Sequence, residues 1–354
     1  MYSWFLYKYV TIIKDMIVSK SMVTGIVVGV AAAIVFVFLQ QEVQKLINPI
    51  HENADDRRLE KYSFPELKKT TFPPSKIHII EKVEKDPQVL SYTFYFFDGE
   101  KKVSGILNAP KLPGKYPIVL MFRGYVDKEI YQPGIGTQRA AEFFAKNGFI
   151  TLSPDFLGYG SSDPVSNDSL ESRFQTYTTA LSLFASLGNL NDALPEVQEG
   201  LQANPEKVAV WAHSNGGQIA LSALEITEKE YPLTLWAPVT HPFPESILYF
   251  ADEMEDGGKY IRGIVGDFVQ RYNPRLYSPP QYLGWLKAPV QLHQGTTDDA
   301  VPLQWSNVFA DKLDELKKPY SYYIYDEEDH NFTKGSWTTL VLRDLQFFRK
   351  NLDL

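Results

Sequence analysis

A serine lies where an apolar strand pattern changes abruptly into a helical pattern. Ser214 follows the apolar run 208–211, with Ala212 two residues before it and Gly216 two residues after it. Small residues are needed at these positions when a strand turns directly into a helix and lifts a nucleophile clear of a sheet. The Asn215 N–H would then lie at a helix N-terminus, where it can donate to an oxyanion. A serine that merely caps a helix is the alternative interpretation.

A serine hydroxyl becomes a strong nucleophile only when a base takes its proton and a carboxylate orients that base. In strand–turn–helix sites of this kind, the chain order is serine, then the acid, then histidine. Asp298 and Asp299 follow an apolar strand, and His330 follows the next strand. We therefore predict Ser214, Asp298 and His330 as a catalytic triad, with Asp299 as the reserve for the acid.

The second oxyanion donor should come from the loop after an earlier buried strand. Residues 117–122 form that strand, and Gly124 permits a tight loop in which the Tyr125 N–H is the expected donor. The Tyr125 ring can also wall the substrate pocket. Arg123, beside this loop, is a candidate for binding a substrate carboxylate, with a structural salt bridge as the alternative.

Short apolar runs alternate with helical patterns over most of the chain, which predicts a mostly parallel, doubly wound α/β sheet. Three β-rich segments, 78–83, 90–97 and 102–109, predict an antiparallel start to this sheet. The other predicted strands are 117–122, 149–153, 208–211, 233–237, 290–292 and 321–325. The predicted helices are 138–146, 169–186, 216–228, 303–316 and 337–348. The chemistry of such a sheet lies in the loops beyond the carboxyl ends of its strands.

The domain from residue 76 to the end resembles an α/β-hydrolase of the prolyl oligopeptidase catalytic-domain type, a group close to the dienelactone-hydrolase-like esterases. The resemblance rests on four segments in the family's order: 155–163, 212–217, 288–302 and 328–332. It implies an α/β-hydrolase fold and acyl-enzyme chemistry. Arg123-Gly124-Tyr125 stands where the family usually has His-Gly-Gly, and fold membership alone does not fix the substrate.

Residues 241–282 contain several aromatic residues in helical-looking stretches between two predicted strands. We expect this segment to form a small helical cap over the substrate pocket. Most of its aromatic side chains should pack within the cap, and some should face the site and favour an apolar or aromatic substrate group.

The run between Lys20 and Glu42 contains no charged residue, and its seventeen most apolar residues, 23–39, would span about 26 Å as a helix. We predict a transmembrane anchor over 21–41, with a cleavable signal peptide as the closest alternative. Residues 1–20 are predicted to be cytoplasmic, because their lysines outnumber their acids. Residues 42–75 are predicted to be a linker to the 76–354 hydrolase domain, which is then extracytoplasmic.

The amino-acid composition excludes several classes of function. The chain has no cysteine, which excludes a thiol nucleophile and thiolate metal sites, and it has no metal or nucleotide-binding motif. The net charge of −8 gives no support for a nucleic-acid partner. We predict a single-pass membrane serine hydrolase, without cofactor or metal, that cleaves amide bonds of small peptides or ester bonds. A carboxylesterase and a non-catalytic binding protein on a hydrolase fold are the alternatives, and the oligomeric state is left open.

Overall fold

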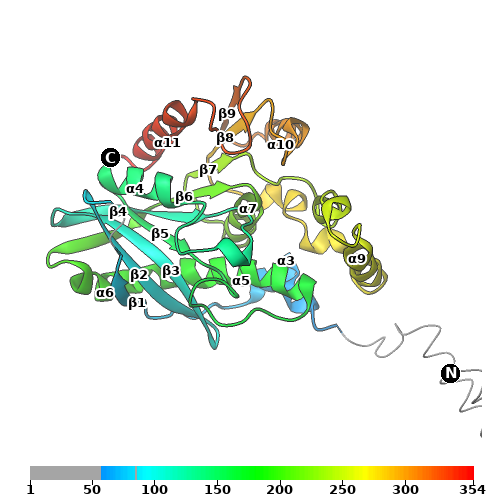
Figure 1. Cartoon of the computed structure of the whole chain (residues 1–354), viewed down its shortest axis with the longest axis horizontal. Helices are drawn as coiled ribbons and strands as arrows, with labels where there is room; N and C mark the ends of the chain where they lie inside the picture. Colours follow the sequence, from blue (N-terminus) through cyan, green and yellow to red (C-terminus); the bar gives the residue numbers. More distant parts are fainter. Residues whose placement is uncertain (1–56, 84–85) are drawn as a thin grey trace, which may run out of the picture. The chain divides into compact units, whose positions relative to one another are not determined.

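The computed structural model describes residues 57–83 and 86–354. Within these residues, nine strands form one sheet in the order β1-β2-β3-β5-β4-β6-β7-β8-β9 (Figure 1). The pairs from β1 to β5 are antiparallel and those from β5 to β9 are parallel. The predicted α/β architecture with an antiparallel start is therefore confirmed.

The strands are β1 (His78–Lys82), β2 (Val89–Asp98), β3 (Lys101–Pro110), β4 (Gly114–Phe122), β5 (Ile150–Pro154), β6 (Leu201–His213), β7 (Leu233–Trp236), β8 (Val290–Gly295) and β9 (Tyr320–Tyr325). The helices are α3 (Phe64–Lys69), α4 (Gln138–Lys146), α5 (Ser169–Ser186), α6 (Leu190–Val197), α7 (Asn215–Thr227), α8 (Glu245–Leu248), α9 (Lys259–Arg271), α10 (Leu303–Glu315) and α11 (Trp337–Asn351). Helices α3 and α6 were not predicted from the sequence.

Two hydrophobic layers cover the two faces of the sheet, and the alternation of strand residues assigns each side chain to one of them. On β4, Ile118, Leu120 and Phe122 belong to the cluster that also contains buried residues of α5, α7 and α10. The intervening residues Val119 and Met121 belong to the cluster formed with α4 and α11. Burial on both faces explains why the central strands are apolar without a polar alternation.

The folded unit begins earlier in the chain than the sequence indicated. It starts at Arg58, so residues 58–75 belong to the fold and not to the predicted linker. Tyr62, Phe64 and Leu67 are buried in the cluster with α5 and α7, and Phe64 stacks on Tyr282 with ring centroids 4.8 Å apart. Charged residues between these apolar ones lie at the surface, which is why the segment looked like a polar linker.

The segment between β7 and β8 is helical, as expected for the cap. It contains α8, α9 and four 3₁₀ turns: η4 (Ala251–Glu253), η5 (Pro274–Tyr277), η6 (Pro279–Gln281) and η7 (Leu283–Trp285). Phe243, Phe268 and Tyr272 are buried and pack on one another or on neighbouring rings, whereas Tyr249 and Tyr260 are exposed. Most of the cap's buried aromatic side chains therefore serve packing.

The predicted cytoplasmic segment 1–20, the transmembrane segment 21–41 and the first part of the linker, up to residue 56, lie outside the described residues. In the part of the chain that the structure does describe, no helix has both the length and the apolar character needed to span a bilayer.

Candidate active site

Ser214 lies in a sharp turn between β6 and α7, at the carboxyl end of the central strands. Its backbone has φ 56° and ψ −125°, a conformation that side-chain-bearing residues seldom adopt. The turn is held because the Ser214 N–H donates to the Trp236 carbonyl at 2.9 Å and the Ser214 carbonyl accepts from Val239 N–H at 2.9 Å. Strained backbone held in this way is a feature of functional sites.

Close backbone packing explains the small residues around the turn. A Cβ atom on Gly216 would lie 2.0 Å from the Phe122 carbonyl oxygen, so only glycine fits where α7 begins against β4. A Cβ on Gly124 would lie 2.8 Å from Ser214 Cβ and 3.3 Å from Ser214 Oγ. The loop after β4 therefore passes directly beside the serine hydroxyl, as the oxyanion prediction requires.

Asp298 and His330 meet in the loops that follow β8 and β9. The His330 Nδ1 and Asp298 Oδ2 atoms are 2.9 Å apart, and the Asp298 side chain is fully buried while that of His330 is 14% exposed. Asp299 is exposed and makes no such contact. The carboxylate accepts only, so Nδ1 carries the proton and Nε2 is the nitrogen left to act as a base.

The Asp298 carboxylate is held in its ionised form. Burial opposes ionisation, but hydrogen bonds from His330, Val301 N–H (2.7 Å) and Gln294 Nε2 (2.8 Å) outweigh it, so the pKa of Asp298 lies below its ordinary value. A further bond from Ala300 N–H, at 2.9 Å, fixes the orientation of the carboxylate. A negative, immobile Asp298 can hold His330 and stabilise it when it becomes protonated.

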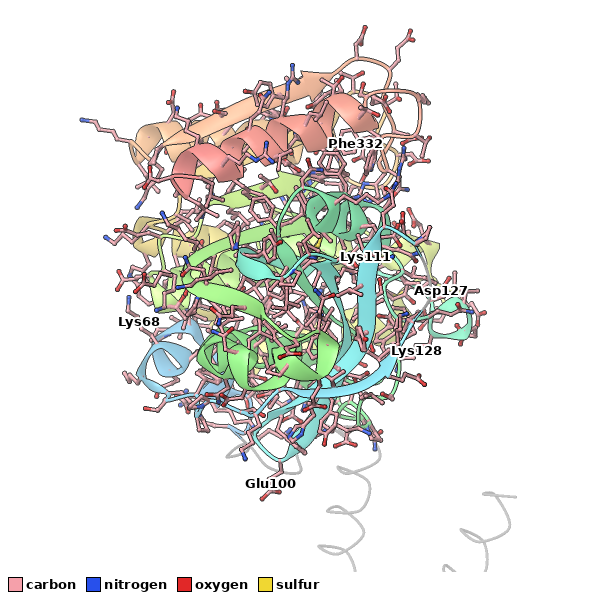
Figure 2. All side chains as sticks on the ribbon, turned by 90° about the vertical axis from the view of Figure 1, so that its left-hand side faces the viewer. Lys68, Glu100, Lys111, Asp127, Lys128 and Phe332 are labelled. Carbon is pink, nitrogen blue, oxygen red and sulfur yellow. The ribbon has the colours of Figure 1, made fainter. Side chains whose placement is uncertain are left out.

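Two contacts hold the His330 loop in place. Phe332, which is labelled in Figure 2, is completely buried. Its ring packs edge-on against Trp236 and Tyr325. His213, the residue before Ser214, lies with its ring centroid 4.6 Å from that of His330, and its Nε2 is 3.0 Å from the His330 carbonyl oxygen. The nucleophile turn and the histidine loop are thus joined through His213.

Ser214 and His330 themselves do not share a hydrogen bond in the part of the chain that the structure describes. His330 Nε2 has no other hydrogen-bond partner there either. Hydrogen bonds of this type are often long in ligand-free enzymes and shorten when substrate binds.

His213 is a residue of the site that the sequence reasoning did not assign. A carbonyl oxygen only accepts, so His213 Nε2 must donate to the His330 carbonyl. Burial, followed by repulsion from the His330 charge, lowers the pKa of His213 to about 4, so this histidine is neutral at pH 7. Its position directly before the serine was the available signal, but nothing in the sequence indicated that its ring reaches across to His330.

Arg123 braces the oxyanion loop. Its guanidinium donates to the carbonyls of Gly124 (2.8 Å) and Asp155 (3.0 Å), and it lies 4.2 Å and 4.6 Å from the ring centroids of Tyr159 and Tyr131. Only 6% of the residue is exposed. A buried guanidinium that contacts backbone carbonyls and ring faces supports the loop. Arg123 also lines the cavity beside this loop, and its Nε has no hydrogen-bond partner among the described residues, so the binding of a substrate carboxylate by Arg123 stays a prediction. The alternative prediction was a structural salt bridge of Arg123. Among the described residues, Arg123 forms no such ion pair.

A cavity of about 210 Å³ opens beside the oxyanion loop. Gly124, Tyr125 and Asn215 form one wall, so the cavity reaches the two backbone positions predicted to hold an oxyanion. Its other walls combine aromatic and aliphatic residues with three cationic ones, Arg123, Lys128 and Arg173. The Tyr125 side chain is 74% exposed at the rim. Among the described residues, no group of three or more acidic or histidine side chains is arranged to hold a metal ion.

Comparison with known proteins agrees with this geometry. Residues 192–354 match the model of the prolyl oligopeptidase family, and residues 99–239 match that of the chlorophyllase family. An uncharacterized peptidase from Bacillus subtilis, YtmA, is 24% identical over 265 residues, covering 73% of this chain and 93% of its own length. The chain thus has the α/β-hydrolase fold and is similar to the prolyl oligopeptidase family over residues 192–354. It is a serine hydrolase, either a peptidase or an esterase.

Solved structures share the fold of this hydrolase. Acetyl xylan esterase 1 from Thermoanaerobacterium superposes with a TM-score of 0.57 at 17% identity, covering 83% of this chain and 94% of its own. An acetyl xylan esterase from Paenibacillus gives 0.54 at 17% identity, covering 84% and 95%. A putative dipeptidyl aminopeptidase IV from Bacteroides ovatus gives 0.53 at 16% identity, with 75% of this chain matched to only 36% of that protein. The single-domain esterases thus match over nearly their whole length.

Proposed function

We propose that the hydrolase cleaves an amide or ester bond through an acyl-enzyme, with Ser214 as nucleophile, His330 as base and Asp298 as orienting acid. The observation that carries this proposal is the 2.9 Å contact between His330 Nδ1 and the buried Asp298 carboxylate, beside a strained serine turn. A histidine bound through Nδ1 keeps Nε2 free to take a proton.

In the first half-reaction, Ser214 Oγ attacks the scissile carbonyl carbon while its proton passes to His330 Nε2. The resulting oxyanion accepts hydrogen bonds from the Asn215 and Tyr125 N–H groups. The tetrahedral intermediate collapses, His330 returns the proton to the leaving amine or alcohol, and the acyl group remains on Ser214. Water, deprotonated by His330, then releases the acid and restores the serine hydroxyl.

Between the two bond types, we favour the amide of a small peptide, with a carboxylesterase as the second candidate. The peptidase description of the Bacillus subtilis relative and the prolyl oligopeptidase family match support the first. The single-domain esterases that match over nearly their whole length favour the second. Parallel assays on p-nitrophenyl esters and on peptide p-nitroanilides will rank the two by kcat/KM.

A fluorophosphonate probe tests the triad directly. We expect the wild-type chain to be labelled, and we expect labelling to be lost in Ser214→Ala and strongly slowed in His330→Gln. A wild-type protein that folds but does not react with the probe would exclude this mechanism, and labelling that persists in Ser214→Ala would assign the nucleophile elsewhere.

We further propose that residues 21–41 anchor the enzyme in a membrane, with residues 1–20 cytoplasmic and the hydrolase domain extracytoplasmic. The support is the uncharged run and the excess of lysine before it. Fractionation should recover the full chain with membranes and release it only with detergent. Added protease should reach the hydrolase domain from the extracytoplasmic side, and protection there would reverse the proposed orientation.

A further inference from the structure

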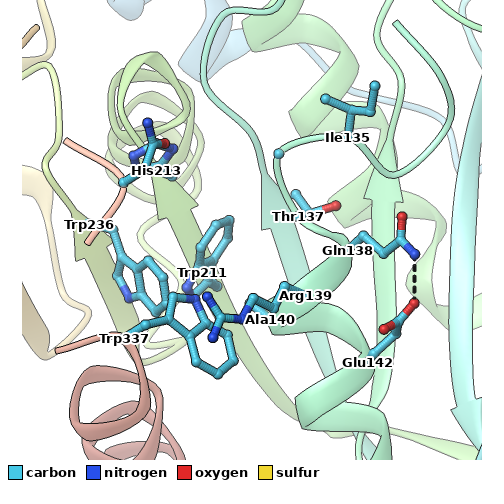
Figure 3. A pocket seen from close by; sticks show the side chains of 12 residues that line it. Ile135, Thr137, Gln138, Arg139, Ala140, Glu142, Trp211, His213, Trp236 and Trp337 are labelled. Atoms are coloured by element: carbon cyan, nitrogen blue, oxygen red, sulfur yellow. Dashed lines mark hydrogen bonds between the residues drawn. The ribbon is translucent and has the colours of Figure 1, made fainter. Parts of the chain in front are cut away.

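A second cavity, of about 430 Å³, lies on the α4 and α11 side of the sheet (Figure 3). It shares no lining residue with the cavity beside Tyr125. Three tryptophans line it: Trp211 from β6, Trp236 from β7 and Trp337 from α11. The proposed reaction uses none of these side chains, so the cavity calls for an explanation of its own.

The tryptophans meet edge to face and form an aromatic enclosure. The Trp211 and Trp236 ring centroids are 5.0 Å apart at 69°, and those of Trp236 and Trp337 are 6.3 Å apart at 79°. Ligand sites of this size are typically lined by aromatic side chains with a few polar groups that fix orientation. A flat aromatic ring can pack on such walls in the offset or edge-on arrangements that tryptophan favours.

One hydrogen-bond donor of this enclosure lacks an acceptor. The Trp236 indole N–H donates to Asp344 Oδ2 at 2.7 Å. The corresponding Nε1 atom of Trp211 is buried and has no hydrogen-bond partner among the described residues. Buried donors are almost always paired, so we expect a ligand to bring an acceptor into the cavity and to bind the Trp211 N–H.

A cation at the cavity supplies the charge selectivity. The Arg139 guanidinium lies 3.7 Å from the Trp337 ring centroid, and no carboxylate of the described residues forms an ion pair with it. Glu142, the acidic residue of the lining, instead accepts a hydrogen bond from Gln138 at 2.8 Å (Figure 3). A stacked guanidinium presents its N–H groups in the plane that suits a carboxylate. The negative charge of Glu142 on the same helix disfavours a dianion.

We propose that this cavity binds a flat aromatic monocarboxylate. The ring of the ligand packs against the tryptophan walls, and its carboxylate binds Arg139, with the Trp211 N–H as a further donor. His213 and Asn331 also line the cavity, and they precede Ser214 and follow His330 in the chain. The ligand therefore lies next to the proposed reaction centre without filling the cavity at the oxyanion loop.

The test measures the binding of two small probe molecules to the full chain, with tryptophan fluorescence as the signal. The probes are 3-phenylpropionate and its neutral isostere 3-phenylpropanamide, neither of which absorbs at the excitation wavelength of tryptophan. We expect a saturable fluorescence change, with the carboxylate binding roughly tenfold more tightly than the amide, because charge-assisted hydrogen bonds are about twice as strong as neutral ones. Arg139→Gln should reduce carboxylate binding to the level of the amide, and Trp211→Phe should weaken it severalfold.

Arg343→Gln is the matched control. Arg343 also stacks on an aromatic ring, 4.1 Å from the Tyr323 centroid, but it lies outside the cavity lining. This variant should bind the carboxylate as the wild type does. Equal binding of acid and amide, unchanged binding in a folded Arg139→Gln, or no saturable change in the wild type would each overturn the proposal. The measurement requires no turnover, so a failure of the proposed reaction leaves this test intact.

Discussion

The described residues contain two histidine–aspartate pairs of equal length in different surroundings. His330 Nδ1 and Asp298 Oδ2 are 2.9 Å apart in loops at the carboxyl edge of the sheet, and so are His293 Nε2 and Asp344 Oδ1 between β8 and α11. The second pair is completely buried. The His293 Nδ1 is 2.8 Å from the Tyr325 hydroxyl, so both ring nitrogens of His293 are occupied.

A histidine hydrogen-bonded to an aspartate does not by itself make a catalytic site. Asp344 also accepts hydrogen bonds from Trp236 Nε1 (2.7 Å) and Gln291 Nε2 (2.9 Å), which makes it the centre of a saturated network in the core. His330 uses one nitrogen for Asp298 and keeps the other free beside a strained serine. A histidine can move a proton only when its second nitrogen is accessible.

The largest expected effect comes from removing the accessible base. We expect His330→Gln to lower kcat/KM by on the order of 10⁴- to 10⁶-fold, because residues of a triad act as a unit. Unfolding by urea should occur at nearly the wild-type concentration, since the side chain lies at the surface end of the pair. A variant that keeps more than a tenth of the wild-type kcat/KM would show that His330 is not the base.

Replacing Asp298, the acid of the His330 pair, should have the next largest effect. Asp298→Asn keeps the shape but removes the charge that orients and stabilises His330, so kcat should fall roughly 10⁴-fold. Asp299→Asn is the matched control, because Asp299 is exposed and does not contact His330. Similar losses in both variants, measured under saturating substrate, would contradict the assignment of Asp298.

The buried pair should respond in the opposite way. His293→Phe removes a hydrogen bond to the buried Asp344 carboxylate, and we expect the free energy of unfolding to fall by about 2–3 kcal/mol. The kcat of the molecules that remain folded should be close to wild type. Equilibrium urea denaturation measures the first quantity and active-site titration with a fluorophosphonate corrects the second. Loss of kcat without loss of stability would erase the distinction between the two pairs.

Replacing His213 should have the smallest effect. Its contribution is seen in how the free energy of unfolding depends on pH. The pKa of His213 is about 4 in the folded protein, against an ordinary value of 6.5, so the unfolded chain binds more protons between these pH values. The free energy of unfolding therefore decreases as pH falls from about 6.5 to about 4. After allowance for partial exposure, we expect His213 to account for about 1–2 kcal/mol of this decrease.

His213→Phe should remove that share of the pH dependence, which denaturation at several pH values in wild type and variant will measure. It should also lower kcat/KM roughly tenfold at pH 7.5, since one neutral hydrogen bond to the His330 loop is lost. Identical pH dependence in the two proteins would show that His213 is not buried against His330 in solution.

Local patterns gave much of the fold. Helices 138–146 and 169–186 have the bounds that their periodicity predicted, and each of the predicted strands is present with ends shifted by a few residues. β6 begins at Leu201, seven residues before the predicted start. Leu201 and Ala203 are buried in the core, but the largely polar residues 204–207 separate them from the apolar run 208–211, so the extension was missed. The buried residues of 58–69 were missed because the six-residue helix α3, with fewer than two turns, is too short to display a period.

The sequence alone determined the strand–turn–helix context of Ser214, because that context depends on residues that are close together in the chain. It also determined the order of serine, acid and histidine, because each of these residues follows an apolar strand that can be recognised locally. Tertiary structure decided that Arg123 braces a loop, that His293 is structural and that His213 contacts His330. Each of these outcomes depends on which strands are neighbours in the sheet. His213 and His330, 117 positions apart, meet through that order, and no local period encodes it.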